Sequence, residues 1–419
     1  MHIRTLAIGL PLGLAAAAAA LVLTPLAAFG QSGSQSGSHS GSGASKGVLK
    51  LVSSLPRTGS ANAQTTTMVN GIRMAIEEVG GVIDGYEILY EDWDDASPQR
   101  ANWDPQAEAQ NANKAVRDKD IVGYIGTFNS GASKISMPIL NDAGLVMVSP
   151  ANTYPGLTKP GMGEKNEPKV YRKSGKINYF RVVPTDDLQG AVAAEWTKEL
   201  GATKVFVLHD RELYGKGIAD VFAKRSTDIG LSVVGYEGID PKAANYKSLV
   251  TKIKSTGAEL VYFGGTTQNN AGQIAKDLRA GGVDAPFMVP DGCFETAFID
   301  AAGAENLNGK TYITFGGLPA DKLTGKGAEF RENYIKKFGT EPEAYAVYGY
   351  EAARVLLDAI DRAKDKDRES IRQAVADTKN YLGTLGTWSF DENGDTTNKV
   401  MSGQTVVDGK FQFVKVLGQ

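Results

Sequence analysis

The chain has 419 residues, of which 42% are hydrophobic and 22% are charged, and its 45 basic and 48 acidic side chains give a formal net charge of −3. This slightly acidic balance, without a basic stretch interleaved with aromatic residues, excludes a typical nucleic-acid-binding protein. The single cysteine, Cys293, excludes an intrachain disulfide, so the fold must be stabilised by burial of a core.

The first 30 residues have the composition of an export signal. Arg4 is their only fixed charge, a long apolar run follows it, and the small residues Ala28 and Gly30 have the spacing of a signal-peptidase site. The run is also long enough to cross a bilayer, so an uncleaved N-terminal anchor is the alternative. Pro11 and Pro25 favour cleavage. Both alternatives predict an exported protein, periplasmic or at the cell surface, and tethered to the membrane if the segment is retained.

Residues 31–46 form a Gly/Ser-rich tract that cannot bury a core, and we expect a flexible tether there. About 370 residues follow it, enough for two domains of ordinary size.

From residue 47 onward, short β-rich runs alternate with amphipathic helical stretches. The first series predicts strands over 48–55, 86–92, 121–126 and 145–149, and helices over 65–81, 106–119 and 133–144. After a polar stretch, a second series predicts helices over 191–201, 215–230, 246–257 and 269–282, and strands over 204–210, 231–239, 259–265 and 286–292. Repeated β-α units predict parallel sheets covered by helices on both faces, and two series predict two lobes.

The last hundred residues have a different pattern. They predict a strand over 310–317 and helices over 327–339, 344–364 and 368–379. The dipeptides Asn393-Gly394 and Asp408-Gly409 then lie between β-rich runs, which predicts two hairpin turns. We expect this tail to serve both lobes.

The sequence offers little support for catalysis. Histidine occurs only as His2, His39 and His209, so His-based triads and multi-histidine metal sites lack the side chains that they require. No nucleophile–base pair is visible either. We therefore expect a protein that is not an enzyme and that has no metal and no cofactor.

Polar groups follow four of the expected strands at their carboxyl ends, where open parallel sheets bind ligands. The four loops present Ser130, Ala151 with Thr153, Tyr214, and Asp291. Ser130 can cap a helix that begins near Ala132, whose free N–H groups would favour an anion.

Together these groups suit a zwitterion. A carboxylate needs donors such as the hydroxyls of Ser130 and Thr153, whereas an ammonium needs acceptors such as Asp291 and the Ala151 carbonyl. Tyr214 can cover the rest of the ligand or bond its head group. Each residue alone could be a cap or a turn residue; their joint position at strand ends favours a binding site.

Several stretches resemble those of periplasmic leucine/isoleucine/valine-binding proteins, in the same order and spacing. They are "GTFNSGAS", "VSPANTYPGLT", "FRVVPTDDLQG", "VLHDRELYGKG", "ELVYFGG" and "FMVPDG". The resemblance covers essentially the whole chain after residue 47. It implies the type I periplasmic binding protein fold: α/β, with two Rossmann-like lobes whose parallel sheets are joined by a three-crossover hinge. The implied first lobe is 47–183 plus 316–383, and the implied second lobe is 184–315 plus 384–419.

The resemblance also implies roles for the candidate residues. Ser130, Ala151 and Thr153 match the first lobe's grip on the amino-acid head group, Tyr214 matches a contact from the second lobe, and Asp291 stands where the family has an acidic partner for the ammonium.

Three departures from the family are visible. The acid is Asp291 rather than Glu, and Thr266 stands where leucine binders usually have an aromatic residue. A smaller or more polar ligand becomes plausible, and Phe128 is then one of the few large surfaces of the pocket. Residues 159–178 are longer than the usual link, and we expect a surface excursion near the cleft mouth.

The sequence thus predicts a solute-binding component of a branched-chain amino-acid-type ABC transporter. Its expected partners are an α-amino acid (branched-chain, neutral or small polar) or a close analogue and a membrane permease, with no nucleic acid, and the protein is expected to be a monomer. The alternative is a ligand-sensing receptor module of the same fold, anchored by an uncleaved N-terminal segment.

Overall fold

The first sheet is built from the first β-α series. The computed structural model describes residues 45–418, so the predicted signal peptide and nearly all of the tether lie outside the described residues. The sheet order is β2-β3-β1-β6-β7-β8, and all neighbours are parallel except β2 with β3. Its strands are β1 (Gly47–Leu55), β2 (Val82–Ile83), β3 (Tyr86–Asp94), β6 (Ile121–Gly126), β7 (Val146–Ser149) and β8 (Tyr179–Arg181).

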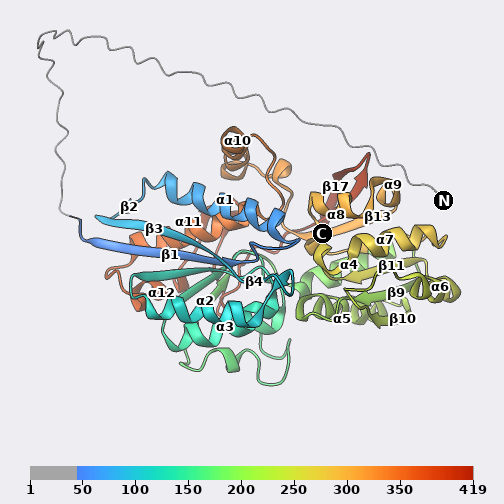
Figure 1. Cartoon of the computed structure of the whole chain (residues 1–419), viewed down its shortest axis with the longest axis horizontal. Helices are drawn as coiled ribbons and strands as arrows, with labels where there is room; N and C mark the ends of the chain where they lie inside the picture. Colours follow the sequence, from blue (N-terminus) through green and yellow to red (C-terminus); the bar gives the residue numbers. More distant parts are fainter. Residues whose placement is uncertain (1–44, 419) are drawn as a thin grey trace, which may run out of the picture. The chain divides into compact units, whose positions relative to one another are not determined.

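Helices cover both faces of this sheet (Figure 1). Core residues of α1 (Asn62–Glu78), α11 (Ala346–Arg362) and α12 (Arg368–Ala376) pack on one face, and those of α2 (Pro105–Arg117) and α3 (Ser130–Asp142) on the other. Every residue of β6 and β7 is buried, as expected for central strands of a sheet covered on both sides. A short antiparallel pair, β4 (Ala96–Ser97) with β5 (Asn102–Trp103), precedes α2.

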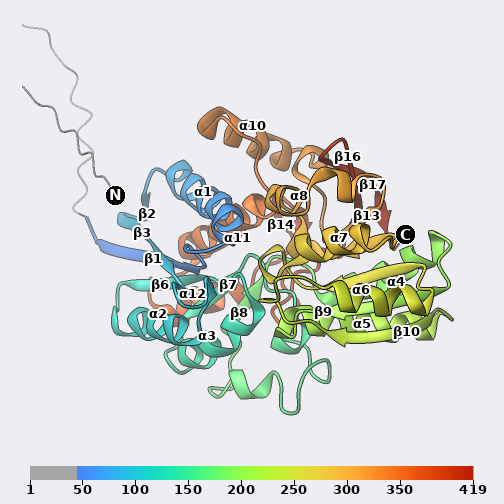
Figure 2. The same ribbon diagram turned by 45° about the vertical axis from the view of Figure 1, so that its right-hand side comes forward.

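The second sheet has the order β10-β9-β11-β12-β13-β16-β17. Its parallel strands are β9 (Lys204–His209), β10 (Ser232–Gly238), β11 (Leu260–Gly264), β12 (Phe287–Val289) and β13 (Thr311–Gly316). Residues of α4 (Asp186–Glu199) and α5 (Leu213–Asp228) pack on one face, and residues of α6 (Lys247–Thr256), α7 (Ala271–Ala280) and α8 (Thr296–Ala302) on the other, followed by the short α9 (Ala304–Leu307). Figure 2 shows these helices around the second sheet.

The last hundred residues contribute helices to the first lobe and strands to the second. After α10 (Lys326–Phe338), the helices α11 and α12 join the core of the first sheet. The second sheet is extended by β16 (Met401–Val407), which is antiparallel to β13, and by β17 (Lys410–Leu417), which is antiparallel to β16. The predicted α/β fold with two sheet-bearing lobes is confirmed. The first lobe contains the first sheet, and the second lobe contains the second sheet. The boundaries given above for the lobes stay a prediction.

One of the two predicted hairpins is confirmed and the other is wrong. Asp408 and Gly409, both at positive φ, turn the chain between β16 and β17. Around Gly394 there is only an isolated bridge between Phe390 and Thr396, because the Asp391 carboxylate accepts the N–H groups of residues 393 and 395 and closes a local turn instead. An unpredicted hairpin pairs β14 (Tyr381–Gly383) with β15 (Gly386–Trp388).

Among the described helices, none combines the length and the apolar character needed to cross a membrane.

Two glycines let α1 and α11 approach each other closely. A Cβ on Gly71 would lie 2.3 Å from the carbonyl oxygen of Ala346, and one on Gly349 would lie 2.4 Å from that of Met68. Both obstacles are backbone atoms, which cannot rotate away. The contact therefore fixes the distance at which the tail docks on the first lobe.

We predict that Gly71→Ala destabilises the protein. Overpacking against backbone costs about 1–3 kcal/mol, more than the gain of up to about 1 kcal/mol from replacing a helical glycine by alanine. Urea unfolding should show a lower midpoint than wild type, whereas Arg73→Ala on the exposed side of the same helix should change it little. An unchanged midpoint for Gly71→Ala would show that the helices separate without cost.

Candidate functional site

The loops after β6 and β7 are joined by the side chain of Asn152. Its Nδ2 donates to the Phe128 carbonyl (3.0 Å) and to the Thr127 hydroxyl (3.2 Å), and its Oδ1 accepts from Tyr179 (3.1 Å) and from the Thr127 N–H (3.3 Å). The hydroxyl of Ser149 accepts the N–H of Asn152 at 2.9 Å. These buried polar residues hold the two candidate loops of the first lobe in one arrangement.

Ser130 lies in the predicted place but does not cap the helix. α3 begins at Ser130 itself, two residues earlier than predicted, with Asn129 at the N-cap position and no side-chain cap bond. The prediction that Ser130 is a helix cap is therefore wrong. Its hydroxyl instead accepts the N–H of Tyr154 at 3.4 Å, which links the first turn of α3 to the loop after β7.

Thr153 presents a buried hydroxyl that has no hydrogen-bond partner among residues 45–418. Its carbonyl accepts the N–H of Asp186 at 2.9 Å. The carbonyls of its neighbours Asn152 and Tyr154 are held by Arg181. The backbone is thus fixed on both sides of Thr153, while the hydroxyl itself remains available.

Asp291 is buried among three donors from three other elements. Its Oδ1 accepts from Gln189 of α4 (2.8 Å) and from the Tyr214 hydroxyl (2.7 Å), and its Oδ2 accepts from the Tyr345 hydroxyl at the start of α11. The Gly292 N–H donates to Tyr214 at 3.2 Å. Tyr214 was expected in a loop; it is the second residue of α5, because that helix begins at Leu213. Burial raises the pKa of Asp291, although the three donors act in the opposite direction.

The sequence did not single out Asp186, the first residue of α4. It is fully buried, and both of its carboxylate oxygens lack a partner within the described part of the chain. Burial raises the pKa of Asp186 well above its ordinary value, and repulsion from Asp291 raises it further, whereas the adjacent Thr153 side chain acts in the opposite direction. The acidic pair "DD" after Pro184-Thr185, at the start of a predicted helix, is the signal that could have located it.

The remaining candidates lie around the same seam between the lobes. Ser130, Tyr214 and Thr266 line one cavity together with Trp103 and Asn269. The Thr266 hydroxyl is buried and unpartnered in the described chain.

Phe128 packs edge-on against Tyr345 with ring centroids 6.1 Å apart, and Ala151 belongs to the same buried apolar cluster as Phe128. The structure thus brings together predicted site residues of the first lobe and of the second lobe, but their roles in binding stay a prediction.

The lobes touch across this seam. Asn102 donates to Asn269 at 3.3 Å, and Arg100 lies 3.8 Å from Glu212. The cavity between them has a volume of about 10 Å³, roughly the space for one water. A ligand of amino-acid size can therefore enter only when these contacts open.

The excursion over 159–178 is anchored on Glu167. This buried carboxylate accepts from Tyr154 (3.2 Å), from Tyr171 and from the Glu164 N–H (2.7 Å), and pairs with Lys134 at 2.7 Å. Beside the excursion, a hollow of about 600 Å³ is lined by residues of both lobes, including Met162, Glu164, Leu213 and Lys216.

Within residues 45–418, no group of three or more His, Cys, Asp or Glu is arranged to hold a metal ion. At the seam, the first lobe contributes the hydroxyls of Ser130 and Thr153, and the second contributes carboxylates together with the hydroxyls of Tyr214 and Thr266. Such a set can bind a small ligand that carries both charges, and it offers no nucleophile paired with a base.

Known proteins resemble the chain over nearly its full described length. The family model described as "Periplasmic binding protein" matches residues 49–410. The Leu/Ile/Val-binding protein homolog 1 of Brucella suis biovar 1 (strain 1330) is 30% identical over 370 residues, covering 86% of this chain and 92% of the relative.

Solved structures agree. The leucine binding protein LivK of Thermotoga maritima MSB8 has a TM-score of 0.78 at 27% identity, covering 88% of this chain and 99% of its own. The branched-chain amino acid transporter substrate binding protein LivJ of Streptococcus pneumoniae, in complex with isoleucine, has a TM-score of 0.75 at 25% identity, with the same coverages of 88% and 99%.

A Rhodopseudomonas palustris solute binding protein in complex with benzoate has a TM-score of 0.74 at 17% identity, covers 88% of this chain and 96% of its own, and shares the fold. The family match extends over most of the chain, and the relatives are covered almost completely. The chain therefore belongs to the periplasmic leucine/isoleucine/valine-binding protein family.

Proposed function

We propose that the protein captures an α-amino acid, or a close analogue, between its two lobes and delivers it to the permease of an ABC transporter. The observation that carries this proposal is the pairing of Asp186 and Asp291, two buried carboxylates of which the first has no partner in the described chain. The names of the relatives, which include leucine- and isoleucine-binding transport proteins, support the same class of ligand.

An ammonium group suits this pair of acids. Burying an isolated carboxylate is costly unless a cation or several donors compensate it. An ammonium brings one positive charge and three N–H donors, enough to bond Asp186 and the acceptors beside it. Its charge would also relieve the repulsion between Asp186 and Asp291. A ligand with an ammonium group would therefore stabilise the site in a way that a ligand without a cation cannot.

The carboxylate end of the ligand is assigned to the first lobe. Ser130 lies in the first turn of α3, where backbone N–H groups and the helix dipole favour an anion. Thr153 adds a free hydroxyl. Donors for the anion and acceptors for the cation thus lie on opposite lobes, so only the closed protein satisfies both ends, and ligand favours closure.

The side-chain pocket favours a branched-chain, neutral or small polar amino acid. Thr266 and Asn269 supply polar groups, and Trp103 and Tyr214 supply apolar surface around the same cavity. The pocket is assigned from these lining residues. Because the cavity now holds only about 10 Å³, lobes closed around an amino acid would lie slightly further apart than lobes closed without one.

A ligand panel tests the proposal. Thermal unfolding with each of the L-amino acids should show stabilisation by one or more neutral members, and ligand at a hundred times its dissociation constant adds about 2.7 kcal/mol. Benzoate, a carboxylate without an ammonium, should add nothing. Stabilisation by benzoate and by no amino acid would overturn the assignment of the acids.

We predict that Asp186→Asn abolishes amino-acid binding and stabilises the ligand-free protein. The substitution removes a buried charge without a partner, which is worth about 1–3 kcal/mol, and it removes the main acceptor for the ammonium. Calorimetric titration and urea unfolding measure the two effects.

Asp187→Asn is the matched control. Its carboxylate pairs with Lys159 at 2.7 Å and is about one-fifth exposed, so the substitution should leave binding intact and should not stabilise the protein. If Asp186→Asn bound amino acids like wild type, Asp186 would be excluded from the site.

We predict opposite effects of pH on affinity and on stability. Because the pKa of Asp186 is higher in the folded protein than in the unfolded chain, folding takes up protons between the two values. The ligand-free protein should therefore become more stable as the pH falls toward the ordinary pKa of a carboxyl, while the affinity for an amino acid decreases.

Other buried acids contribute to the stability change, since burial also raises the pKa of Asp210 and of Glu295 to about 7. The Asp186 share is the difference between wild type and Asp186→Asn in the same pH series. An affinity that stays constant over this interval would contradict a role for the acid pair.

A further inference from the structure

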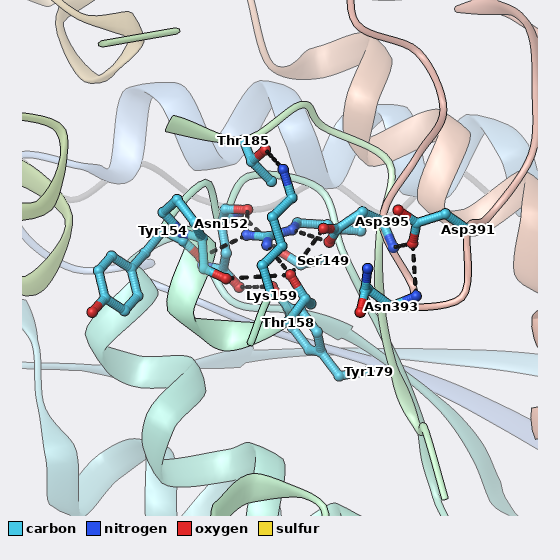
Figure 3. Close-up of polar contacts among 12 residues, drawn as sticks. Ser149, Asn152, Tyr154, Thr158, Lys159, Tyr179, Thr185, Asp391, Asn393 and Asp395 are labelled. Carbon is cyan, nitrogen blue, oxygen red and sulfur yellow. Dashed lines mark hydrogen bonds and ion pairs between the residues drawn. The ribbon is translucent and has the colours of Figure 1, made fainter. Parts of the chain in front are cut away.

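The guanidinium of Arg181, at the end of β8, is completely buried next to the loop after β7. Its Nη1 donates to the carbonyls of Asn152 (3.1 Å) and Tyr154 (2.9 Å), and its Nη2 donates to the Thr158 hydroxyl. Its Nε donates to Asp395 at 2.7 Å. One side chain thus bonds the loop at three positions, two of which flank Thr153. Figure 3 shows the three loop residues that it bonds, Asn152, Tyr154 and Thr158.

Asp395 completes this arrangement from the tail. Its second oxygen accepts from the Thr158 hydroxyl at 2.9 Å. The backbone of the tail also pairs with β8: the Arg181 N–H donates to Gly394, and the Thr396 N–H donates to the Arg181 carbonyl, each at 3.1 Å. Figure 3 shows Asp395 near Thr158, with Asp391 to its right.

The tail segment that carries Asp395 connects the two lobes. It lies between β15 and β16, and therefore follows the helices that pack on the first sheet and precedes the strands that extend the second. Any rearrangement of this segment acts on Arg181, and through Arg181 on the carbonyls at both sides of Thr153.

We propose that Arg181 and Asp395 are positioning residues: they hold residues 151–158, and with them the Thr153 hydroxyl, in a fixed place, and they link this geometry to the tail between the lobes. The effect on ligand affinity rests on the proposed function, whereas the effect on the loop does not. The planar guanidinium is suited to the task because its five N–H donors have fixed directions, which a lysine ammonium lacks.

A purely structural role would stabilise the whole protein without a special effect on the loop. The two roles differ in what happens when the pair is weakened. In Asp395→Asn, the Arg181 guanidinium keeps its charge but loses its anionic partner. Because an unpaired buried charge is strongly destabilising, we expect the guanidinium to move toward solvent and to release the loop carbonyls.

Glu351 provides a matched control. It is an equally buried carboxylate, and it accepts from the Thr384 N–H (2.9 Å), the Thr384 hydroxyl (2.6 Å) and the Trp388 indole (2.7 Å), which hold β14 and β15 rather than the loop. Glu351→Gln therefore also removes a buried carboxylate, but one whose hydrogen bonds do not reach the loop that carries Thr153.

The experiment compares hydrogen–deuterium exchange in peptides covering residues 151–158 for the ligand-free full chain. Exchange should be about tenfold faster or more in Asp395→Asn than in wild type, and unchanged in Glu351→Gln at a similar loss of thermal stability. Equal exchange in the two variants would overturn the proposal.

Thr158→Val gives a second variant if Asp395→Asn does not fold. It keeps the ion pair and removes only the hydroxyl that bonds both Arg181 and Asp395, so the same peptides should show a smaller acceleration. Unchanged exchange in Thr158→Val would count against the loop-positioning role.

Calorimetric titration with L-leucine and L-isoleucine gives the second readout. Affinity should fall about tenfold in Asp395→Asn and stay within about twofold of wild type in Glu351→Gln. If wild type binds no amino acid, the proposed function fails, but the exchange measurement still decides whether Arg181 and Asp395 position the loop.

Discussion

Two carboxylates buried at one seam are the electrostatic constraint around which this molecule is arranged. Asp291 receives three donors from elements of both lobes, whereas the neighbouring Asp186 receives none in the described chain. A buried carboxylate without a partner lowers the stability of the protein. Binding sites keep such destabilising groups because the ligand compensates them. Asp291 is kept in a fixed position beside Asp186. Tyr345, which packs against Phe128, and the hydroxyl of Tyr214 both hold its carboxylate.

The first lobe contributes a rigid polar framework rather than further charge. Asn152 joins the loops after β6 and β7, and Arg181 fixes the backbone that carries Thr153. Neither side chain is assigned to the ligand, yet both hold the loops that carry the proposed ligand contacts of the first lobe. The buried pair of Arg181 with Asp395 is costly to desolvate, and its geometry rather than its net energy is the property that the loop depends on.

Most of the fold could be predicted from hydrophobic periodicity, because the strands and helices of both series depend on local pattern. Tyr214 and Asp291 could be placed near each other because parallel strands bring their carboxyl ends to one edge. The partners of Asp291 could not: Gln189 lies 102 residues away in the chain and Tyr345 lies 54 residues away. The Arg181–Asp395 pair, 214 residues apart, has no local signal at all. The prediction that Ser130 caps α3 is wrong because the helix begins at Ser130 itself, and its hydroxyl accepts the N–H of Tyr154, a residue of another loop that the local sequence does not reveal.

The order of the chain has a consequence for biogenesis. Helices α11 and α12 finish the covering of the first sheet, and β16 and β17, which end at Leu417, finish the second sheet. Neither half is therefore encoded by a contiguous stretch: a product that ended before β16 would lack two strands of the second sheet, and one that ended before α11 would also leave apolar surface of the first sheet uncovered. Because sequence-distant contacts form slowly, the polypeptide stays vulnerable to aggregation and proteolysis until its final residues have been synthesised.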